Sequence, residues 1–184
     1  MVINVNSAIP IDNSLFQSYI ESFVINCPSA TVISKKKDKS KTYNNVSARN
    51  CSFRDRGITG TLLTTVTSQI KKYMRNGLFK KASNKERVEV EFDIDNSSEK
   101  IVFCENTQMS DAEVVFYYIR NAFAHGDFEY LPSNGMYKLE SKKKDVVKAQ
   151  MLLSETTLNR LSGLLRLDKS KIMSLQKRRR STHS

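Results

Sequence analysis

The sequence has little of what disulfide frameworks, zinc sites and membrane spans require. Its three cysteines are odd in number and lack the paired spacing of a zinc site or a disulfide framework, so we interpret them as reduced thiols. No run of about 18 apolar residues occurs, which excludes an ordinary transmembrane helix. The first residues lack the basic and apolar regions of a secretory signal. We therefore expect a cytoplasmic protein that does not act at a membrane.

Basic charge, by contrast, is abundant. Lysine and arginine number 30 against 19 aspartate and glutamate residues, which gives a net charge of +11. The excess is gathered in runs at residues 35–41, 71–75, 80–81, 142–144 and 177–180. Such runs attract a polyanion through phosphate contacts, although any one of them can also be a solvated loop or tail. We expect Lys35, Lys36 and Lys37, in a basic loop over about residues 32–56, to contact RNA.

Apolar residues at helical spacing predict four helices, over about residues 11–25, 58–76, 110–126 and 154–167. The threonines of the second segment lower its helix propensity, so a partly extended structure stays open there. Four helices of this length favour an up-and-down bundle.

Alternating residues at 88–94 and a return strand at 101–104 predict a β-hairpin over about residues 88–105. Asn134-Gly135 predicts a second hairpin between 128–131 and 136–139, and a further strand is expected at 146–153. Together the elements predict one mainly α domain over residues 1–168, a four-helix bundle with antiparallel β-hairpin insertions. Residues 169–184 are expected to form a basic, disordered tail.

The third predicted helix carries polar groups on an otherwise apolar segment. Ser110 and Glu113 have the spacing of a capping box at its start, and Gly126 suits a left-handed cap at its end. Successive residues turn by about 100°, which places the groups that can hold a proton or a charge on one side. These groups are Glu113, Tyr117, Tyr118, Arg120, Asn121 and His125.

Arg120, Asn121 and His125 suit the cleavage of a phosphodiester in RNA. Arginine offers a charged fork that fits a phosphate, and histidine moves protons near neutral pH. Because the ribose 2′-OH is a nucleophile already in the substrate, neither a metal nor another cofactor is required. A purely structural interpretation stays open: Arg120 would pair with Glu113 or another carboxylate, and His125 would bond to the last carbonyls of its helix.

Arg120-Asn121 followed by His125 resembles the Arg-x4-6-His signature of the HEPN superfamily (higher eukaryotes and prokaryotes nucleotide-binding domains). The Ala-His-Gly turn and the hairpin after it look similar to small prokaryotic HEPN proteins of toxin and phage-defence systems. The motif covers about ten residues, and the helical pattern extends the resemblance loosely over the rest.

The resemblance implies a HEPN-like helical bundle that forms a homodimer, with two copies of the motif facing each other in a composite site. It also implies metal-independent endoribonuclease activity, with Arg120, Asn121 and His125 as catalytic residues. One subgroup has a modified tyrosine two residues after the histidine, where this chain has Asp127. Silencing by that route is therefore not expected, and a protein antitoxin that acts by occlusion, or no antitoxin, stays open.

We accordingly expect an endoribonuclease that acts as a toxin or phage-defence effector and uses RNA as its partner. Tyr117 and Tyr118 are expected to stack on bases or to support the catalytic residues. Two alternatives stay open: a catalytically inactive HEPN module that binds nucleic acid or nucleotide, and a structural subunit that recruits a partner.

Overall fold

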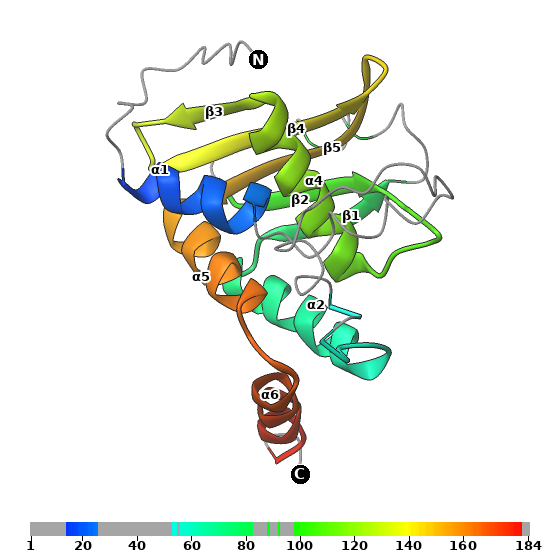
Figure 1. Ribbon diagram of the computed structural model, residues 1–184. Helices are drawn as coiled ribbons and strands as arrows, with labels where there is room; N and C mark the ends of the chain where they lie inside the picture. The colour runs from blue at the N-terminus through cyan, green and yellow to red at the C-terminus, as the bar shows by residue number, and fades with distance from the viewer. Residues whose placement is uncertain are drawn as a thin grey trace, which may run out of the picture.

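A five-stranded mixed sheet forms the centre of the protein in a computed structural model (Figure 1). The structure describes residues 14–25, 53–54, 56–82, 88, 92 and 98–181, with the side chains of 179–181 left out. The strands lie in the order β1-β2-β5-β4-β3; β1 and β2 are parallel and the other neighbours are antiparallel. The strands are β1 Leu78–Ala82, β2 Lys100–Cys104, β3 Phe128–Leu131, β4 Met136–Lys143 and β5 Val146–Ser154.

Helices pack on one face of this sheet. They are α1 Ser14–Tyr19, which continues as the π-helix η1 Ile20–Ile25, α2 Thr61–Tyr73, α4 Asp111–His125, α5 Glu155–Leu165 and α6 Lys169–Ser181. Figure 1 shows α4 crossing the sheet and α6 at the opposite end of the molecule from β3. Among the described helices, none is long and apolar enough to span a membrane.

The predicted mainly α four-helix bundle is wrong, because the fold is α/β. Strands β2, β3 and β4, which were expected in separate hairpin insertions, belong to one sheet, and both of its faces are apolar. Alternate residues of β5 show why: Ala149, Met151 and Leu153 face the helices, whereas Leu152 joins a second, smaller cluster on the other face. Other elements have to cover both apolar faces of such a sheet. Hairpins inserted into a helical bundle would leave one face of each hairpin uncovered.

The first strand of the predicted hairpin over residues 88–105 lies almost entirely outside the described residues. Both edges of β2 are already occupied, since Lys100 lies opposite Leu78 of β1 on one side and Leu152 of β5 on the other. The return strand expected at 101–104 therefore has β1 and β5 as its neighbours. Of residues 88–94 the structure describes only Val88 and Phe92, which pack in the smaller cluster.

Several local predictions are confirmed. The hairpin at Asn134-Gly135 joins β3 to β4, with Leu131 opposite Met136, and the strand expected at 146–153 is β5. The second helix is α2, so the partly extended alternative is wrong. The short strand β1 was not predicted.

The expectation of a disordered tail is wrong for residues 169–181, which form α6. Asp168 caps this helix, because its carboxylate accepts hydrogen bonds from the Ser170 hydroxyl at 2.6 Å and the Lys171 backbone N–H at 2.8 Å. Ile172 is fully buried, and α6 packs against α2. One apolar side chain and a cap therefore hold a segment whose charge indicated disorder.

Helix α4 lies between β4 on one side and η1 and α2 on the other. Its ends are those predicted: Ser110 and Glu113 form the capping box, and Gly126 has a φ of 77° in the left-handed region. Burial extends around most of the helix, and Tyr118 and Asn121 of the predicted polar side are buried as well. The helix therefore has two packed faces rather than one packed and one exposed face.

Replacing Ser110 with alanine should lower the free energy of unfolding by about 1 kcal/mol. The variant loses the hydroxyl that accepts the Glu113 backbone N–H at 3.4 Å and donates to the Glu113 carboxylate at 2.8 Å. Urea unfolding of the two proteins measures the difference. Ser133→Ala, in the exposed turn between β3 and β4, is the matched control and should leave the midpoint unchanged. Equal midpoints for Ser110→Ala and the original protein would show that the cap contributes nothing.

Alkaline pH should destabilise the fold through its buried tyrosines. Burial, with Glu155 and Tyr130 nearby, raises the pKa of Tyr137 from 10.0 to about 12. Because the folded-state pKa is the higher one, this contribution to stability is complete below pH 10 and is lost as the pH rises from 10 through 12. Urea midpoints measured across this range, with tyrosinate absorbance as the second signal, test the expectation. In Tyr137→Phe the decline with pH should be shallower, and an identical decline would contradict the assignment to this residue.

Candidate functional site

His125 is the exposed member of the predicted catalytic set. It is the last residue of α4, and Gly126 turns the chain away directly after it. No described residue hydrogen-bonds to its ring. The imidazole therefore does not bond to the last carbonyls of its helix, as the purely structural interpretation expected. The carbonyl of Ala122 is instead satisfied by the backbone N–H groups of Gly126 and Asp127. The imidazole is therefore accessible to a ligand.

Arg120 and Asn121 form a second, partly buried pair on the same helix. The Arg120 Nη1 group donates to the Asn121 side-chain oxygen at 3.1 Å. The Arg120 Nε atom is buried and has no hydrogen-bond partner among the described residues. Glu113, considered as a partner for Arg120, instead bonds to Ser110 at the other end of the helix. The guanidinium thus keeps a donor that is not used within the described fold.

The structure brings Arg120 and Asn121 together but does not bring His125 into the same hollow. His125 lines a hollow of about 360 Å³ together with Asp127, Glu129, Lys138, Glu140 and Lys142. Asn121 lines a neighbouring hollow of about 570 Å³, and Lys142 lines both. Arg120 lines neither of these two hollows. Within one chain, the predicted catalytic residues are therefore adjacent along α4 rather than convergent.

The hollow of His125 is more acidic than a phosphate site requires. Three carboxylates and two lysines line it. Burial opposes ionisation of Glu140, but hydrogen bonds from Lys142 and Gln150 outweigh this effect and hold the pKa of Glu140 below its ordinary value. The positive charge nearest the second hollow is that of Lys142, which lines both hollows.

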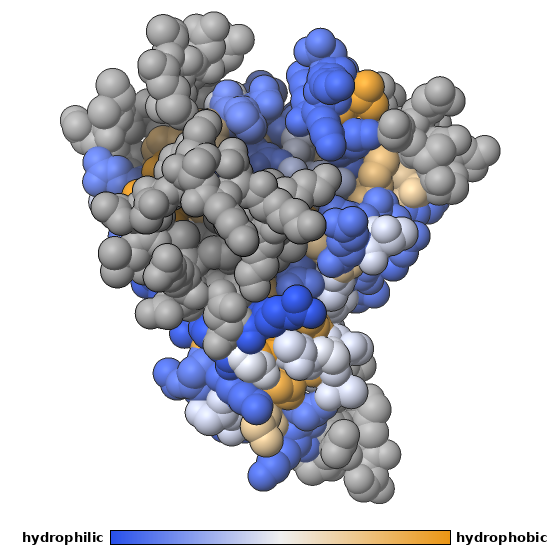
Figure 2. Space-filling view, turned by 45° about the vertical axis from the view of Figure 1, so that its right-hand side comes forward, coloured by the Kyte–Doolittle hydropathy of each residue, from blue (hydrophilic) through white to orange (hydrophobic). Residues whose placement is uncertain are grey.

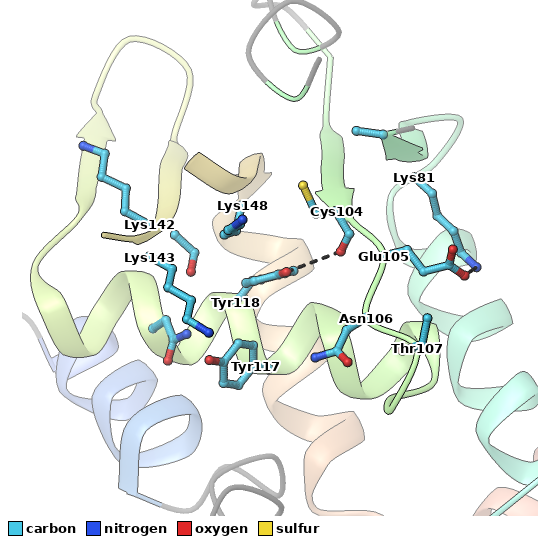
Figure 3. Close-up of a pocket in the computed structure, with 13 residues that line it drawn as sticks. Lys81, Cys104, Glu105, Asn106, Thr107, Tyr117, Tyr118, Lys142, Lys143 and Lys148 are labelled. Carbon is cyan, nitrogen blue, oxygen red and sulfur yellow. Dashed lines mark hydrogen bonds and ion pairs between the residues drawn. The ribbon is translucent and has the colours of Figure 1, made fainter. Parts of the chain in front are cut away.

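Lysines dominate the larger hollow, which is shown in Figure 3. Lys81 from β1, Lys142 and Lys143 from β4 and Lys148 from β5 line it, and Glu105 is its one lining carboxylate. The Lys81 ammonium lies 3.0 Å from Asp111 and 3.3 Å from Glu105, and the hydrogen bond to Asp111 is the main cause that raises the pKa of Lys81. Lys142 is held by Glu140.

Tyr117 and Tyr118 line the same hollow from α4 (Figure 3). Their rings are 5.3 Å apart at an interplanar angle of 57°. The Tyr118 hydroxyl donates to the Cys104 carbonyl at 3.3 Å, and burial raises the pKa of Tyr118 to about 12. Tyr118 is thus fixed in its place, whereas the half-buried Tyr117 ring is available for contact with a ligand.

Sequence reasoning placed Lys143 in the basic run at residues 142–144 but did not find Ser141 and Lys148 as lining residues. Their placement depends on the sheet: Ser141 lies opposite Ala149, but the next residue of β4, Lys142, lies opposite Val147, which makes Lys148 the extra residue of a β-bulge. A bulge changes the direction of a side chain. No signal in the sequence marks its position.

The remaining predicted RNA contacts are those of the basic loop. Lys35, Lys36 and Lys37 fall outside the described residues. Among the residues that the structure describes, no three histidine, cysteine, aspartate or glutamate side chains gather in a group that could hold a metal ion. Figure 2, which brings forward the side where the β4–β5 hairpin ends, shows hydrophilic residues over most of the described surface.

Comparisons with known proteins add no assignment to this geometry. Neither a protein-family model, nor a curated protein, nor a solved structure matches the chain.

Proposed function

We propose that the protein is a metal-independent endoribonuclease of the HEPN type that acts as a homodimer on RNA in the cytoplasm. One observation carries the proposal: a single helix presents an exposed imidazole, His125, and a guanidinium with an unused donor, Arg120, beside a hollow lined by lysines. The four-helix bundle is not part of the proposal, because the fold is α/β. Support comes from the local arrangement on α4 and from the basic charge of the chain.

In the proposed reaction, the ribose 2′-OH attacks the phosphorus, and the bond from phosphorus to the 5′ oxygen breaks. An imidazole accepts the 2′ proton, and an imidazolium donates a proton to the departing 5′ oxygen. The products are a 2′,3′-cyclic phosphate and a 5′-hydroxyl. Arg120 stabilises the extra charge on the phosphate, and Asn121, bonded to Arg120 at 3.1 Å, positions the guanidinium.

A homodimer accounts for the observation that Arg120 and His125 lie on one helix but do not meet within one chain. In this proposal His125 of one protomer meets Arg120 of its partner, and this one imidazole takes the 2′ proton and then, as the imidazolium, protonates the departing 5′ oxygen. The role of toxin or phage-defence effector belongs to the same proposal. Asp127 stands at the position of the modified tyrosine of one HEPN subgroup, so control is assigned to an occluding protein or to no antitoxin.

Binding of RNA without cleavage is the second candidate function. The lysine-lined hollow favours it, because attraction of phosphates requires only charge and not an aligned acid and base. A test for cleavage separates the two candidates.

His125→Ala and Arg120→Ala should each reduce cleavage of total RNA about a hundredfold or more, since removing one positioned charge has an effect of this size. The assay uses purified protein in EDTA, and the ends of the products are identified as 2′,3′-cyclic phosphate and 5′-hydroxyl. His183→Ala and Arg54→Ala are matched controls and should cleave normally. Full activity in His125→Ala would reject the catalytic assignment, and RNA binding without cleavage by the original protein would favour the second candidate.

A mixture of Arg120→Ala and His125→Ala should recover part of the activity that each variant lacks. If the site joins Arg120 of one protomer to His125 of the other, a mixed dimer retains one site with both groups. The two purified variants are unfolded together, refolded and assayed on the same RNA, with each variant refolded alone as the control. No recovery in dimers shown to be mixed would contradict the composite site while leaving cleavage itself unaffected.

A further inference from the structure

The Ser141 hydroxyl is buried in the wall of the larger hollow without a partner. Its residue is 2% exposed, and its Oγ atom has no hydrogen-bond partner among the residues that the structure describes. Buried hydroxyl groups are nearly always hydrogen-bonded, so an unpaired one calls for an explanation such as a ligand. Because Ser141 lines the hollow, an acceptor atom placed there would satisfy its hydroxyl.

The space in front of Ser141 results from a change of residue size along β4. Alternate residues of this strand face the helices, and Tyr137 and Leu139 are buried and fill the space beneath α4. The next residue of the row is Ser141, whose small side chain leaves space, and the row ends with Lys143. The hollow of about 570 Å³ that results is within the size range of small-molecule sites.

Helix α4 adds further hydrogen-bond donors to the same hollow. The Asn121 side-chain oxygen already accepts from Arg120, which does not line the hollow, so the amide nitrogen of Asn121 is left with its two donors. The Tyr117 hydroxyl has no hydrogen-bond partner within the described part of the chain. Figure 3 shows the Lys143 side chain extending from β4 toward Tyr117. A ligand that fits this arrangement is therefore rich in acceptor atoms.

Charge limits the ligand to a single negative charge. Other residues of the fold already hold three of the four lining lysines, Lys81, Lys142 and Lys148. For Lys143 there is no ion pair among the described residues. One ammonium balances one negative charge, and a second charge in the hollow would stay uncompensated, which is costly.

The burial of Ser141 distinguishes between two kinds of monoanion. A phosphodiester carries one charge, but a strand continues from it in two directions. A carboxylate ends its molecule and can therefore reach a hydroxyl group whose residue is 2% exposed. It also has two oxygens with about four acceptor sites, which match donors that come from both the strand and the helix.

We propose that the larger hollow binds a small organic monocarboxylate, held by the Ser141 hydroxyl and the Lys143 ammonium. The two residues are two apart on β4, so their side chains leave one face of the strand roughly 7 Å apart, and the long lysine side chain closes that distance. The Asn121 amide donates to the same carboxylate, and the body of the ligand lies against the Tyr117 ring. The site is independent of cleavage, because His125 does not line this hollow.

Titrations of the full-length protein, followed by NMR of its backbone amides, test the carboxylate requirement. The probes are phenylacetate, phenylacetamide, which has the same shape without the charge, and phenyl phosphate, which carries close to two charges at neutral pH. We expect phenylacetate to bind about tenfold or more tightly than phenylacetamide, as the loss of charge-assisted hydrogen bonds predicts. Equal affinity for these two probes, no binding of either, or tighter binding of phenyl phosphate overturns the proposal.

Variants then locate the site. Ser141→Ala and Lys143→Gln should each weaken binding of phenylacetate about tenfold. Ser141→Ala should not lower the urea midpoint of the free protein, because its hydroxyl has no bond to lose among the described residues. Lys138→Gln is the charge-matched control, since Lys138 belongs to the same strand but lines the hollow of His125. Unchanged affinity in Ser141→Ala, as expected if water satisfies the hydroxyl, or an equal loss in Lys138→Gln, rejects the assignment.

A competition experiment separates this site from the binding of a strand. A short 2′-O-methylated RNA, which cannot be cleaved by 2′-OH attack, should leave phenylacetate bound. Displacement of phenylacetate would show that the hollow receives RNA, and the carboxylate assignment would be overturned. His125→Ala should bind phenylacetate with the affinity of the original protein even where it has lost cleavage, and a loss of binding in this variant would place the probe in the other hollow.

Discussion

The packing of helix α4 on two sides is the constraint on which the rest of the structure depends. Its apolar residues meet η1 and α2 on one side, where Phe123 contacts Phe23 with the rings 5.8 Å apart. On the other side it covers β4. A helix enclosed in this way can keep polar groups only where its neighbours leave space. Tyr117 and Asn121 therefore face the hollow at the end of the sheet, and His125 lies at the end of the helix.

The two hollows are thereby placed side by side along one rigid element. Lys142 lines both hollows, and its salt bridge with Glu140 connects the acidic surroundings of His125 with the basic surroundings of Asn121. Residues fixed on a helix and a sheet hold their geometry better than residues on loops.

Local features could be predicted from the sequence, and distant pairings could not. Ser110 with Glu113 and the cap at Gly126 act within one helical turn, so their spacing alone predicts both ends of α4. The neighbours of β2 come from residues 78–82 and 146–154, and no pattern within residues 100–104 indicates either. For the site, the motif residues on α4 were found because helical spacing groups them. Ser141 and Lys148 were missed because a sheet register and a bulge place them.

The β4–β5 turn joins the strands that carry Lys143 and Lys148. Lys144 and Asp145 form a two-residue connection in which both φ angles are positive, 51° and 60°, a conformation that asparagine and glycine adopt more readily. Each such residue stores strain of roughly 1 kcal/mol or more, so the strand ladder on either side must hold the turn closed. A connection this short cannot slide or lengthen. The backbone positions of Lys143 and Lys148, on opposite arms, are consequently held at a fixed separation in the wall of the hollow.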